Sequence, residues 1–429
     1  MPDFLFEDIV DKKNGFLRGP FGGDLKKEIF VPKSKYTYKV YEQGVVLNRD
    51  SSIGRYYISK DYFDKKMHRF EVSTKDFLVS CSGVNYGAIY QLDQNIEPGV
   101  INQALLRIKL DNKKIYDNYF LYLFRLHIVN MIVGRKGDST IPNFPPLTVI
   151  KKLKLSLPSL NIQEKVGGLL RSLDDKIELN NRINTELETM AKTLYDYWFV
   201  QFDFPDANGK PYKTAGGKMA YNATLNRDIP ESWEVKHLDN HLTCNAKKLG
   251  KKHNLAEIEY LDTANLTKNV IYTLQHLEFR EDNVPSRANM IVSKNDILYS
   301  TVRPNQYHYG LIRYPVDNMV ASTGFSVLSH KTNTEYNAIF YLHLTNDATS
   351  DRLIRISESS KSSYPSISPS DILNINIALP NTDELLNKAS TFLNPMFDKI
   401  AIAQSENKEL ESLRDWLLPM LMNGQVTVK

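Results

Sequence analysis

The sequence predicts an α+β fold in which two similar globular domains are separated by long helices. We expect these helices to pack as an antiparallel coiled coil, and we expect an internal pseudo-twofold repeat. Three observations support this prediction: short segments recur in the same order in the two halves of the chain, two alternating strands end in the same Leu-Pro step, and two long stretches carry apolar residues at helical spacing. A chain of 429 residues has room for two or three domains.

The repeat consists of four pairs of similar segments that keep the same order along the chain. The pairs are residues 76–78 with 296–298, 100–104 with 320–324, 175–177 with 398–400, and 186–188 with 409–411. The first two pairs share one offset, and the last two share an offset that is only slightly longer. Four ordered matches at nearly one offset favour a duplicated unit, in which a globular region is followed by a long helix.

Each globular region is predicted to end in a half-buried strand. Apolar and polar residues alternate in residues 150–157 and again in residues 372–379, which is the spacing of a strand with one buried face. Each stretch follows a loop that begins at a proline, Pro142 in the first unit and Pro365 in the second. Each also ends in a Leu-Pro step.

The long helices are predicted from apolar residues at steps of three and four. The first helix covers residues 161–200 and would be about 60 Å long. Its expected seam consists of Ile162, Val166, Leu169, Leu173, Ile183, Leu187, Met190 and Leu194, and the second helix contributes Leu410, Leu413 and Leu417. Polar residues interrupt the seams at Lys176, Asn180, Lys399 and Glu406, where they cost stability but can fix register. Surface helices with one buried stripe are the alternative.

Domain boundaries follow from these elements. We expect a first globular domain in residues 1–158, a spacer helix in residues 159–204 and a turn-rich linker in residues 205–228. A second globular domain would cover residues 229–380. A second spacer helix would cover residues 381–429, with a kink or break at Pro395.

The composition permits a packed core but does not reveal a partner. Hydrophobic residues make up 42% of the chain, and 54 basic residues against 50 acidic ones give a net charge of +4. An ordinary soluble protein and a DNA-binding protein with acidic residues elsewhere both fit this balance. Cys81 and Cys244 form no CxxC pair, so we expect no zinc site and a reducing, cytoplasmic location. We recognise no signal peptide and no apolar run of about 20 residues, and we expect no membrane association.

The motifs of common catalytic sites are incomplete. Gly216-Gly217-Lys218 is followed by Met219, where a phosphate-binding loop needs Ser or Thr for magnesium. Asn143-Phe144-Pro145-Pro146 has the residues of an adenine methyltransferase loop in the wrong order, so a turn is favoured. Glu406-Asn407-Lys408 lies in a predicted helix, where a solvated charged face explains it better than a nuclease site. We therefore expect no catalytic residue, no metal site and no cofactor bound by this chain.

Basic residues beside aromatic and amide side chains are the candidate DNA contacts. Lys and Arg neutralise phosphates, and Arg, Asn and Gln can pair with base edges. The candidates are Lys26, Lys27, Arg49, Arg55, Arg69, Asn85, Tyr86, Arg135 and Lys136 in the first domain, and Lys247, Lys248, Lys251, Lys252, Arg303, Asn305, Gln306, Tyr307 and Lys361 in the second. Arg303, Asn305 and Gln306 place three base-reading side-chain types close together in the sequence. A solvated surface position is the alternative for any single one of these residues.

Several segments together resemble the specificity (S) subunit of type I restriction–modification systems. They are Gly19-Pro20-Phe21-Gly22, Ile141-Pro142-Asn143, Leu157-Pro158-Ser159-Leu160, Asn161-Ile162-Gln163-Glu164-Lys165, Leu173-Asp174-Asp175-Lys176-Ile177, Leu194-Tyr195-Asp196-Tyr197-Trp198-Phe199, and Ile229-Pro230 with Trp233. The resemblance covers essentially the whole chain and is most specific in the helical segments. The second repeat departs from the pattern at Asn381-Thr382-Asp383-Glu384, which lacks the Gln-Glu-Lys run of the first.

The resemblance implies a function and a set of partners. Each globular region would be a target-recognition domain that binds one half of a bipartite double-stranded DNA site, and the helices would set the gap between the half-sites. Two modification (methyltransferase) subunits and the restriction (translocase and nuclease) subunits would bring AdoMet, ATP and Mg²⁺ to the complex, while this chain would perform no catalysis. A non-catalytic scaffold with duplicated domains and a fused restriction–methylation enzyme are the alternatives.

Overall fold

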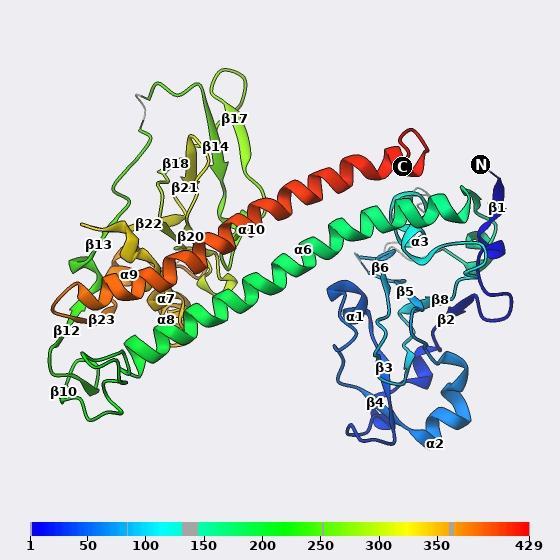
Figure 1. Cartoon of the computed structure of the whole chain (residues 1–429), viewed down its shortest axis with the longest axis horizontal. Helices are drawn as coiled ribbons and strands as arrows, with labels where there is room; N and C mark the ends of the chain where they lie inside the picture. The colour runs from blue at the N-terminus through cyan, green and yellow to red at the C-terminus, as the bar shows by residue number, and fades with distance from the viewer. Residues whose placement is uncertain (1, 84, 131–144, 251–252, 360–363, 429) are drawn as a thin grey trace. The chain divides into compact units, whose positions relative to one another are not determined.

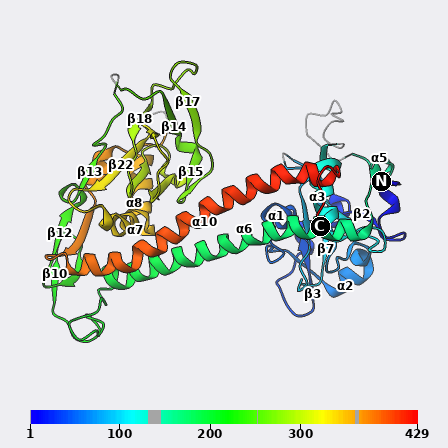
Figure 2. The ribbon, with the colours of Figure 1, turned by 45° about the horizontal axis from the view of Figure 1, so that its top comes forward.

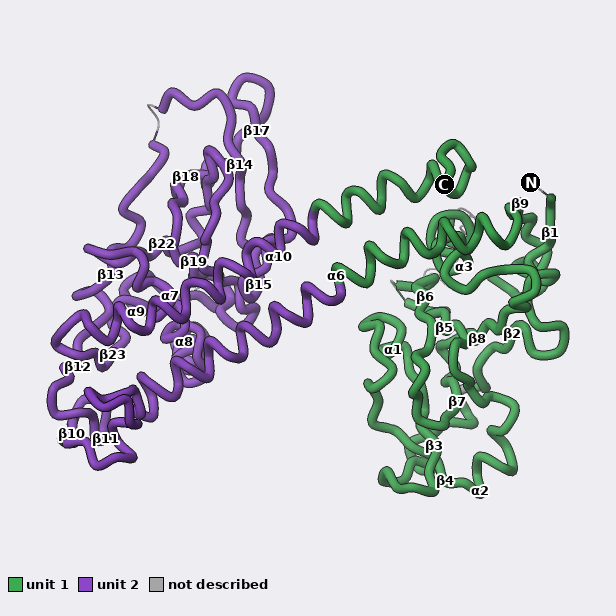
Figure 3. The backbone as a smooth tube through the Cα atoms, viewed as in Figure 1, with its two compact units in different colours: residues 1–177, 409–429 green, residues 178–408 purple. Residues whose placement is uncertain are grey.

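The computed structural model describes residues 2–83, 85–130, 145–250, 253–359 and 364–428. The chain forms two compact units, which we call unit 1 (residues 1–177 and 409–429) and unit 2 (residues 178–408) (Figure 3). Two long helices, α6 (Leu160–Tyr195) and α10 (Glu384–Met422), each contribute a segment to both units (Figure 1). Within the described ranges, no helix combines the length and the apolar character that crossing a membrane requires.

Unit 1 is built on two small sheets. The first sheet is antiparallel and has the order β2 (Phe16–Arg18), β8 (Leu105–Ile108), β5 (Phe77–Ser80), β6 (Ile89–Gln91). The second has the order β4 (Tyr57–Ser59), β3 (Thr37–Tyr41), β7 (Gly99–Ile101), and β3 and β7 are parallel. A separate pair joins β1 (Asp3–Leu5) to β9 (Lys154–Ser156). The short helices are α1 (Gln43–Asn48), α2 (Lys60–Tyr62), α3 (Asp117–Leu123) and α5 (Leu147–Ile150).

Unit 2 contains corresponding sheets and additional hairpins. The first sheet has the order β13 (Leu242–Cys244), β22 (Phe325–His330), β19 (Asp296–Ser300), β20 (Tyr309–Ile312). The second has the order β17 (Gln275–Glu278), β14 (Glu257–Leu261), β21 (Met319–Ser322), β18 (Ala288–Ile291). Smaller pairs are β12 (Trp233–His237) with β23 (Asn376–Pro380), β10 (Met219–Asn222) with β11 (Arg227–Pro230), and β15 (Leu266–Thr267) with β16 (Val270–Ile271). The shorter helices are α7 (Asn337–Thr345), α8 (Asp347–Glu358) and α9 (Pro369–Leu373).

Equivalent strands in the two units pair in the same register, at the offset that relates residues 76–78 to residues 296–298. In the first sheets, Phe77 lies opposite Ile108, and Ile297 lies opposite Leu328. In the second sheets, Val40 and Val100 are parallel partners, as are Tyr260 and Val320. Because a slip of one residue would turn every side chain to the other face, the shared register means that both domains bury equivalent positions.

A buried aspartate explains one of the repeated sequence segments. Asp76 and Asp296 each accept a hydrogen bond from the backbone nitrogen three residues earlier, at 2.8 Å from Ser73 and 2.7 Å from Ser293. The residue before each aspartate, Lys75 or Asn295, has a positive φ (66° and 68°). The carboxylate thus satisfies a backbone donor at the tight turn that leads into the central strand of each sheet.

The two long helices run antiparallel in unit 2 and lie side by side in two views (Figures 1 and 2). Asn180 contacts Asn407, and Trp198, in the π-helical turn Asp196–Val200 that follows α6, contacts Phe392 earlier in α10. The buried positions of α6 form a stripe at steps of three and four, namely Gln163, Val166, Leu170, Ile177, Asn180, Asn184, Ala191 and Tyr195. On α10 the buried stripe consists of Leu386, Ala389, Leu393, Phe397, Ile400, Asn407 and Leu421.

The predicted seam is wrong at five positions. Ile162, Leu169, Ile183 and Met190 are 46%, 36%, 40% and 54% exposed, and Leu413 of α10 is 43% exposed. Val166 is buried, and Leu173, Leu187, Leu194, Leu410 and Leu417 are half-buried. The buried stripe of α6 lies one position away from the most apolar stripe, because polar Gln163, Asn180 and Asn184 occupy buried positions, and Gln163 and Asn180 make hydrogen bonds there.

Polar side chains form a layer between the helices in unit 2. The Asn180 side-chain nitrogen donates to Glu406 Oε2 (2.8 Å) and Asn407 Oδ1 (2.9 Å), and Asn407 donates in turn to Asn181 Oδ1 (2.8 Å). A slip of α10 along α6 would bury these amides without partners, at a cost of about 1–3 kcal/mol each. Glu406 and Asn407 of the Glu406-Asn407-Lys408 sequence therefore contribute to helix pairing.

Three other expectations need correction. Helix α10 continues through Pro395, so the break that was one of the two outcomes expected there is absent. Leu393 and Phe397 on either side are buried and hold the helix against unit 2. The two segments predicted as strands are only partly extended. Residues 150–157 begin at the end of helix α5, and only their second half forms β9. Residues 372–379 likewise begin at the end of helix α9, and only their second half belongs to β23. The segment 205–228, expected to be a linker, contains β10 and the first residues of β11.

Candidate nucleic-acid interface

The connection between β19 and β20 carries the densest group of candidate base readers. It contains a 3₁₀ turn (Pro304–Gln306) flanked by Arg303 and Tyr307. Arg303, Asn305 and Gln306 are exposed, and Pro304 is buried beneath them. The structure thus brings together, on one turn, the three side-chain types that stand close together in the sequence.

Hydrogen bonds hold this turn in place from several sides. The backbone nitrogen of Arg303 donates to the Pro365 carbonyl oxygen (2.9 Å), and that of Gln306 donates to the Arg303 carbonyl oxygen (2.9 Å). His308 Nδ1 lies 2.7 Å from the Leu266 carbonyl oxygen and therefore donates to it, while Nε2 lies 3.1 Å from the Gln306 side chain. A loop that is already ordered loses less conformational entropy on binding.

The equivalent connection in unit 1 joins β5 to β6 and has the same length. In both units the strand residue before the turn closes it: Ser80 N donates to Ala88 O and Ser300 N donates to His308 O, each at 2.8 Å. Asn85 is exposed and stands in this connection at the position that Asn305 occupies in unit 2. Tyr86 corresponds to Gln306 but is half-buried against the core of unit 1.

The two connections share a left-handed backbone at two equivalent positions. In unit 1 these positions are Gly83 (φ +77°) and Gly87 (φ +87°), and in unit 2 they are Arg303 (φ +49°) and Tyr307 (φ +57°). Non-glycine residues pay roughly 1–2 kcal/mol for this conformation. Arg303 also precedes a proline, which favours an extended backbone at the residue before it. Unit 2 therefore keeps two large side chains where the backbone favours glycine.

Lys268 is a neighbour of this turn that the sequence did not reveal. Its ammonium lies 4.9 Å from the centre of the Tyr307 ring, and its backbone nitrogen donates to the Tyr307 carbonyl oxygen (2.9 Å). Both residues line a cavity of about 190 Å³ together with Glu188 and Lys192 of α6, and burial raises the pKa of the Glu188 carboxyl. A single lysine without a basic neighbour gave no sequence signal, because only the fold brings it beside Tyr307.

The remaining basic candidates lie on separate elements. In unit 1, Lys26 and Lys27 begin a 3₁₀ turn, Arg49 ends α1, and Arg55 and Arg69 stack over Tyr56 and Phe70 at 4.9 and 5.7 Å. In unit 2, Lys248 is exposed and Lys247 donates to Ser293 Oγ (3.0 Å). These residues suit phosphate contacts spread along a backbone better than a single compact site.

The β14–β17 edge of unit 2 has the opposite charge. Glu257, Glu259 and Glu278 surround His276, whose Nδ1 lies 2.8 Å from Glu259 Oε1. The hydrogen bond to Glu259 raises the pKa of His276. Because carboxylates repel phosphates, this edge disfavours a DNA backbone.

A family model described as the type I restriction modification DNA specificity domain matches residues 21–189 and 230–412, so one copy falls on each half of the repeat. The chain belongs to this family. As a specificity subunit it is the sequence-specific DNA-recognition component of a type I restriction–modification complex and is itself non-catalytic. The predicted role of a non-catalytic specificity subunit is thereby confirmed.

Relatives of this specificity subunit match it over most of their length. The type I restriction enzyme MjaIX specificity subunit of Methanocaldococcus jannaschii is 26% identical over 364 residues, which cover 82% of this chain and 77% of that protein. The HindI specificity subunit of Haemophilus influenzae is 20% identical over an alignment 458 positions long, which covers 94% of this chain and 98% of that protein. The crystal structure of a type I restriction–modification S subunit from M. genitalium covers 98% of this chain and 95% of its own at 16% identity, and its TM-score of 0.60 shows a shared fold.

Five candidate contacts of the specificity subunit lie outside the described residues. They are Arg135, Lys136, Lys251, Lys252 and Lys361. Asn143 and Phe144 of the expected turn lie outside them as well.

Proposed function

We propose that each globular domain binds one half of a bipartite double-stranded DNA site and reads it with the β5–β6 or the β19–β20 connection. One observation carries this proposal: the first sheets of both domains have corresponding strand orders and the same register, and they carry the same exposed connection with different side chains. Two copies of one reading surface with different side chains fit a site made of two different half-sites.

We further propose that α6 and α10 form an antiparallel coiled coil that relates the two halves by pseudo-twofold symmetry and fixes the spacing between the half-sites. The alternating steps of three and four in the buried stripes support this pairing. The Asn180–Asn407 layer supports a single register, because buried amides without partners destabilise every other register.

The exposed apolar residues of α6 support a docking surface for the modification subunits. Ile162, Leu169, Ile183 and Met190 are exposed and follow one another at multiples of seven residues, and exposed Tyr197 continues this spacing in the π-helical turn after α6. Such a spacing is typical of a helix-packing face. Lys176 takes the one remaining position of this stripe. In the assembled complex these subunits would bring AdoMet, and the restriction subunits would bring ATP and Mg²⁺.

Exchange of one domain tests the half-site assignment. Replacing residues 1–158 with the corresponding domain of another specificity subunit is expected to change one half of the methylated sequence and leave the other half and the spacing unchanged. The measurement is genome-wide mapping of methylated adenines in a strain that carries the complex. Unchanged halves, or a change in both, would contradict the assignment.

Lengthening the helices tests the spacing. One heptad inserted after Asn181 and a matching heptad inserted before Glu406 preserve the polar layer's pairing partners and add roughly 10.5 Å. At about 3.4 Å per base pair, the gap between the half-sites should grow by about three base pairs. A heptad in α6 alone is the control and should weaken recognition, because it breaks the pairing. An unchanged gap in the double insertion would defeat the spacing role.

Charge substitutions test the docking surface. Ile183→Glu combined with Met190→Glu should reduce co-purification of the modification subunit at least tenfold without lowering the melting temperature of the free chain, since both side chains are already exposed. Arg182→Glu, on the next face of the same helix, is the control and should leave co-purification unchanged. Full retention of the modification subunit by the double variant would overturn the proposal.

A further inference from the structure

We infer that Arg303 is a specificity-determining residue, and that it contacts a guanine in the major groove of the half-site bound by unit 2. This inference rests on the proposed half-site recognition and deepens it. It starts from the difference between two connections that otherwise have the same length, closing hydrogen bond and backbone conformation.

A residue that distinguishes the two half-sites must differ between the two domains. Asn85 and Asn305 occupy equivalent positions and present the same amide, so they cannot provide this difference. The left-handed positions do differ: Gly83 and Gly87 in unit 1 have no side chains, whereas Arg303 and Tyr307 in unit 2 have large ones.

Packing accounts for Tyr307 but not for Arg303. The Tyr307 ring is half-buried, lies under the Lys268 ammonium at 4.9 Å and contacts the Tyr309 ring edge-on. The Arg303 side chain is exposed, and within the described part of the chain its guanidinium has no hydrogen-bond or ion-pair partner. The hydrogen bonds that Arg303 makes to Pro365 and Gln306 are those of its backbone.

The backbone conformation at position 303 is unfavourable for arginine for two independent reasons: its φ of +49° favours glycine, and the proline that follows favours an extended backbone instead. A side chain that adds no packing and opposes the local backbone is best explained by a contact outside the chain. Strained residues of this kind cluster at functional sites.

The chemistry of the side chain identifies its target. An arginine guanidinium donates two parallel hydrogen bonds and matches the O6 and N7 acceptors of guanine in the major groove. Arg303 stands on a turn fixed by the Pro365 carbonyl, by Pro304 and by the contacts of His308, so the guanidinium approaches a base from a rigid support.

The test uses the complete complex of this chain with its modification subunits. Adenine methylation is mapped on a library of DNA sites in which every position of both half-sites varies, and the melting temperature of each chain is measured. Arg303→Gly should lower the preference for guanine at one position of one half-site by roughly tenfold or more. The other half-site should be unchanged, and the melting temperature should be unchanged or higher because the backbone strain is relieved.

Two further variants distinguish recognition from structure. Arg303→Lys keeps the charge but not the paired hydrogen bonds, so it should retain overall methylation and lose most of the guanine preference. Asn318→Gly is the matched control, because Asn318 is exposed in unit 2 with a φ of +56°. It should relieve the same kind of strain and change no base preference.

Each outcome decides the inference. A guanine preference that survives in Arg303→Gly would overturn it, and so would a melting temperature that falls together with recognition of both half-sites, which would indicate a structural role. If the unmodified complex showed no bipartite site at all, the proposed function itself would fail, and this failure is visible before any variant is made.

Discussion

The two globular domains share their sheets but are fastened to the long helices by different chemistry. In unit 1 a buried glutamine of α6 makes hydrogen bonds with backbone groups of the domain. In unit 2 a buried arginine of the domain reaches across to α10 and joins a network of carboxylates and amides. Sheet register and helix attachment have therefore diverged to different extents.

The unit 1 attachment depends on close approach. Gln163 Oε1 accepts from the backbone nitrogen of Tyr116 (2.9 Å), and its amide nitrogen donates to the Pro158 carbonyl oxygen (2.9 Å), so the side chain satisfies groups at the start of α3 and of α6. One turn later a Cβ on Gly167 would lie 2.6 Å from the Tyr119 backbone nitrogen. Helix α3 thus packs against α6 with no room for a side chain between them.

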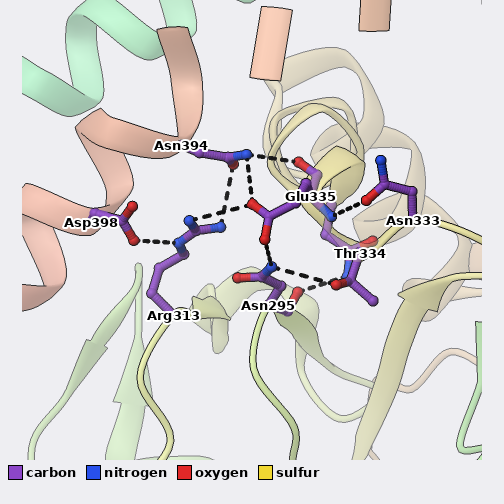
Figure 4. Close-up of polar contacts among 8 residues, drawn as sticks. Asn295, Arg313, Asn333, Thr334, Glu335, Asn394 and Asp398 are labelled. Atoms are coloured by element: carbon purple, nitrogen blue, oxygen red, sulfur yellow. Dashed lines mark hydrogen bonds and ion pairs between the residues drawn. The ribbon is translucent and has the colours of Figure 1, made fainter. Parts of the chain in front are cut away.

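The unit 2 attachment depends on charge (Figure 4). Arg313 Nε donates to Asp398 Oδ1 (2.8 Å), and Nη1 donates to Asn394 Oδ1 (3.3 Å). Asn394 and Asn295 in turn donate to the Glu335 carboxylate at 2.9 and 3.0 Å. At the positions equivalent to Gln163 and Gly167, α10 has Leu386 and Ser390. The second repeat therefore lacks the glutamine that attaches unit 1 to its helix, and unit 2 is attached by other contacts.

Removal of the Arg313 side chain should have the largest effect, a loss of stability in unit 2. Arg313 is only 3% exposed, and Arg313→Ala would leave Asp398 and Glu335 without their cation. Breaking a fully buried ion pair from one side typically costs about 3–5 kcal/mol. Because the Asp398 and Glu335 side chains are 31% and 45% exposed, water will stabilise the carboxylates that remain, so the expected loss lies toward the lower end of that range. Thermal unfolding followed by calorimetry should show a lower transition for unit 2, whereas Arg280→Ala on the exposed β17 turn should show none. A loss below about 1 kcal/mol would mean that the network does not fasten the domain.

Substitution of Asp174 should have the next largest effect, a loss of stability in unit 1. It accepts from Arg414 of α10 (2.7 Å), from the Tyr122 hydroxyl (2.7 Å) and from Arg125 (3.1 Å). Asp174→Asn keeps the shape but removes the charge from these hydrogen bonds, which are worth about 1.5–3 kcal/mol each when charged. The unit 1 transition should fall while the unit 2 transition stays, and the reverse pattern would contradict the assignment.

The same aspartate predicts a pH dependence. Burial by itself would raise the pKa of Asp174, but the hydrogen bonds from Arg414 and Tyr122 and the charges of the two arginines outweigh it and hold the pKa below 3.8. A carboxylate with a lowered pKa in the folded state stabilises the protein above the unfolded pKa, and this contribution is lost as the pH falls through the folded one. The stability difference between Asp174→Asn and the unmodified chain should therefore be full at pH 7 and shrink below about pH 4.

The α+β class and the long helices could be predicted, because a nearly constant offset between repeated segments and apolar steps of three and four are properties of the sequence itself. The buried face of α6 could not be, because apolar Ile162, Ile183 and Met190 are exposed while Gln163, Asn180 and Asn184 are buried. The apolar pattern of a helix does not show which stripe is buried within the chain and which is exposed on its surface. At the candidate interface, composition pointed to Arg303 and its neighbours, but the left-handed backbone and the position of Lys268 depend on contacts between distant segments.

Substitutions of two adjacent glycines of α6 should change the stability of unit 1 by smaller amounts and test whether its attachment depends on close approach. Gly167→Ala would force its Cβ against the Tyr119 backbone and should destabilise unit 1 by about 1–3 kcal/mol. Gly168→Ala is the matched control, because a Cβ there meets no atom within 4 Å and alanine favours the helix by about 0.5–1 kcal/mol. Opposite shifts of the unit 1 melting temperature are expected. Equal shifts would show that α3 does not depend on the missing side chain.

The smallest effect is expected at Ser390, which stands in α10 where α6 has Gly167. Its hydroxyl is buried and has no hydrogen-bond partner among the described residues. Ser390→Ala removes an unsatisfied polar atom and leaves the Cβ in place, so unit 2 should be unchanged or gain up to about 1 kcal/mol. Ser390→Gly should instead destabilise unit 2, by opening space beside the domain and weakening the helix. If Ser390→Gly were as stable as Ser390→Ala, the distance between domain and helix would not explain why unit 1 has a glycine at this position and unit 2 a serine.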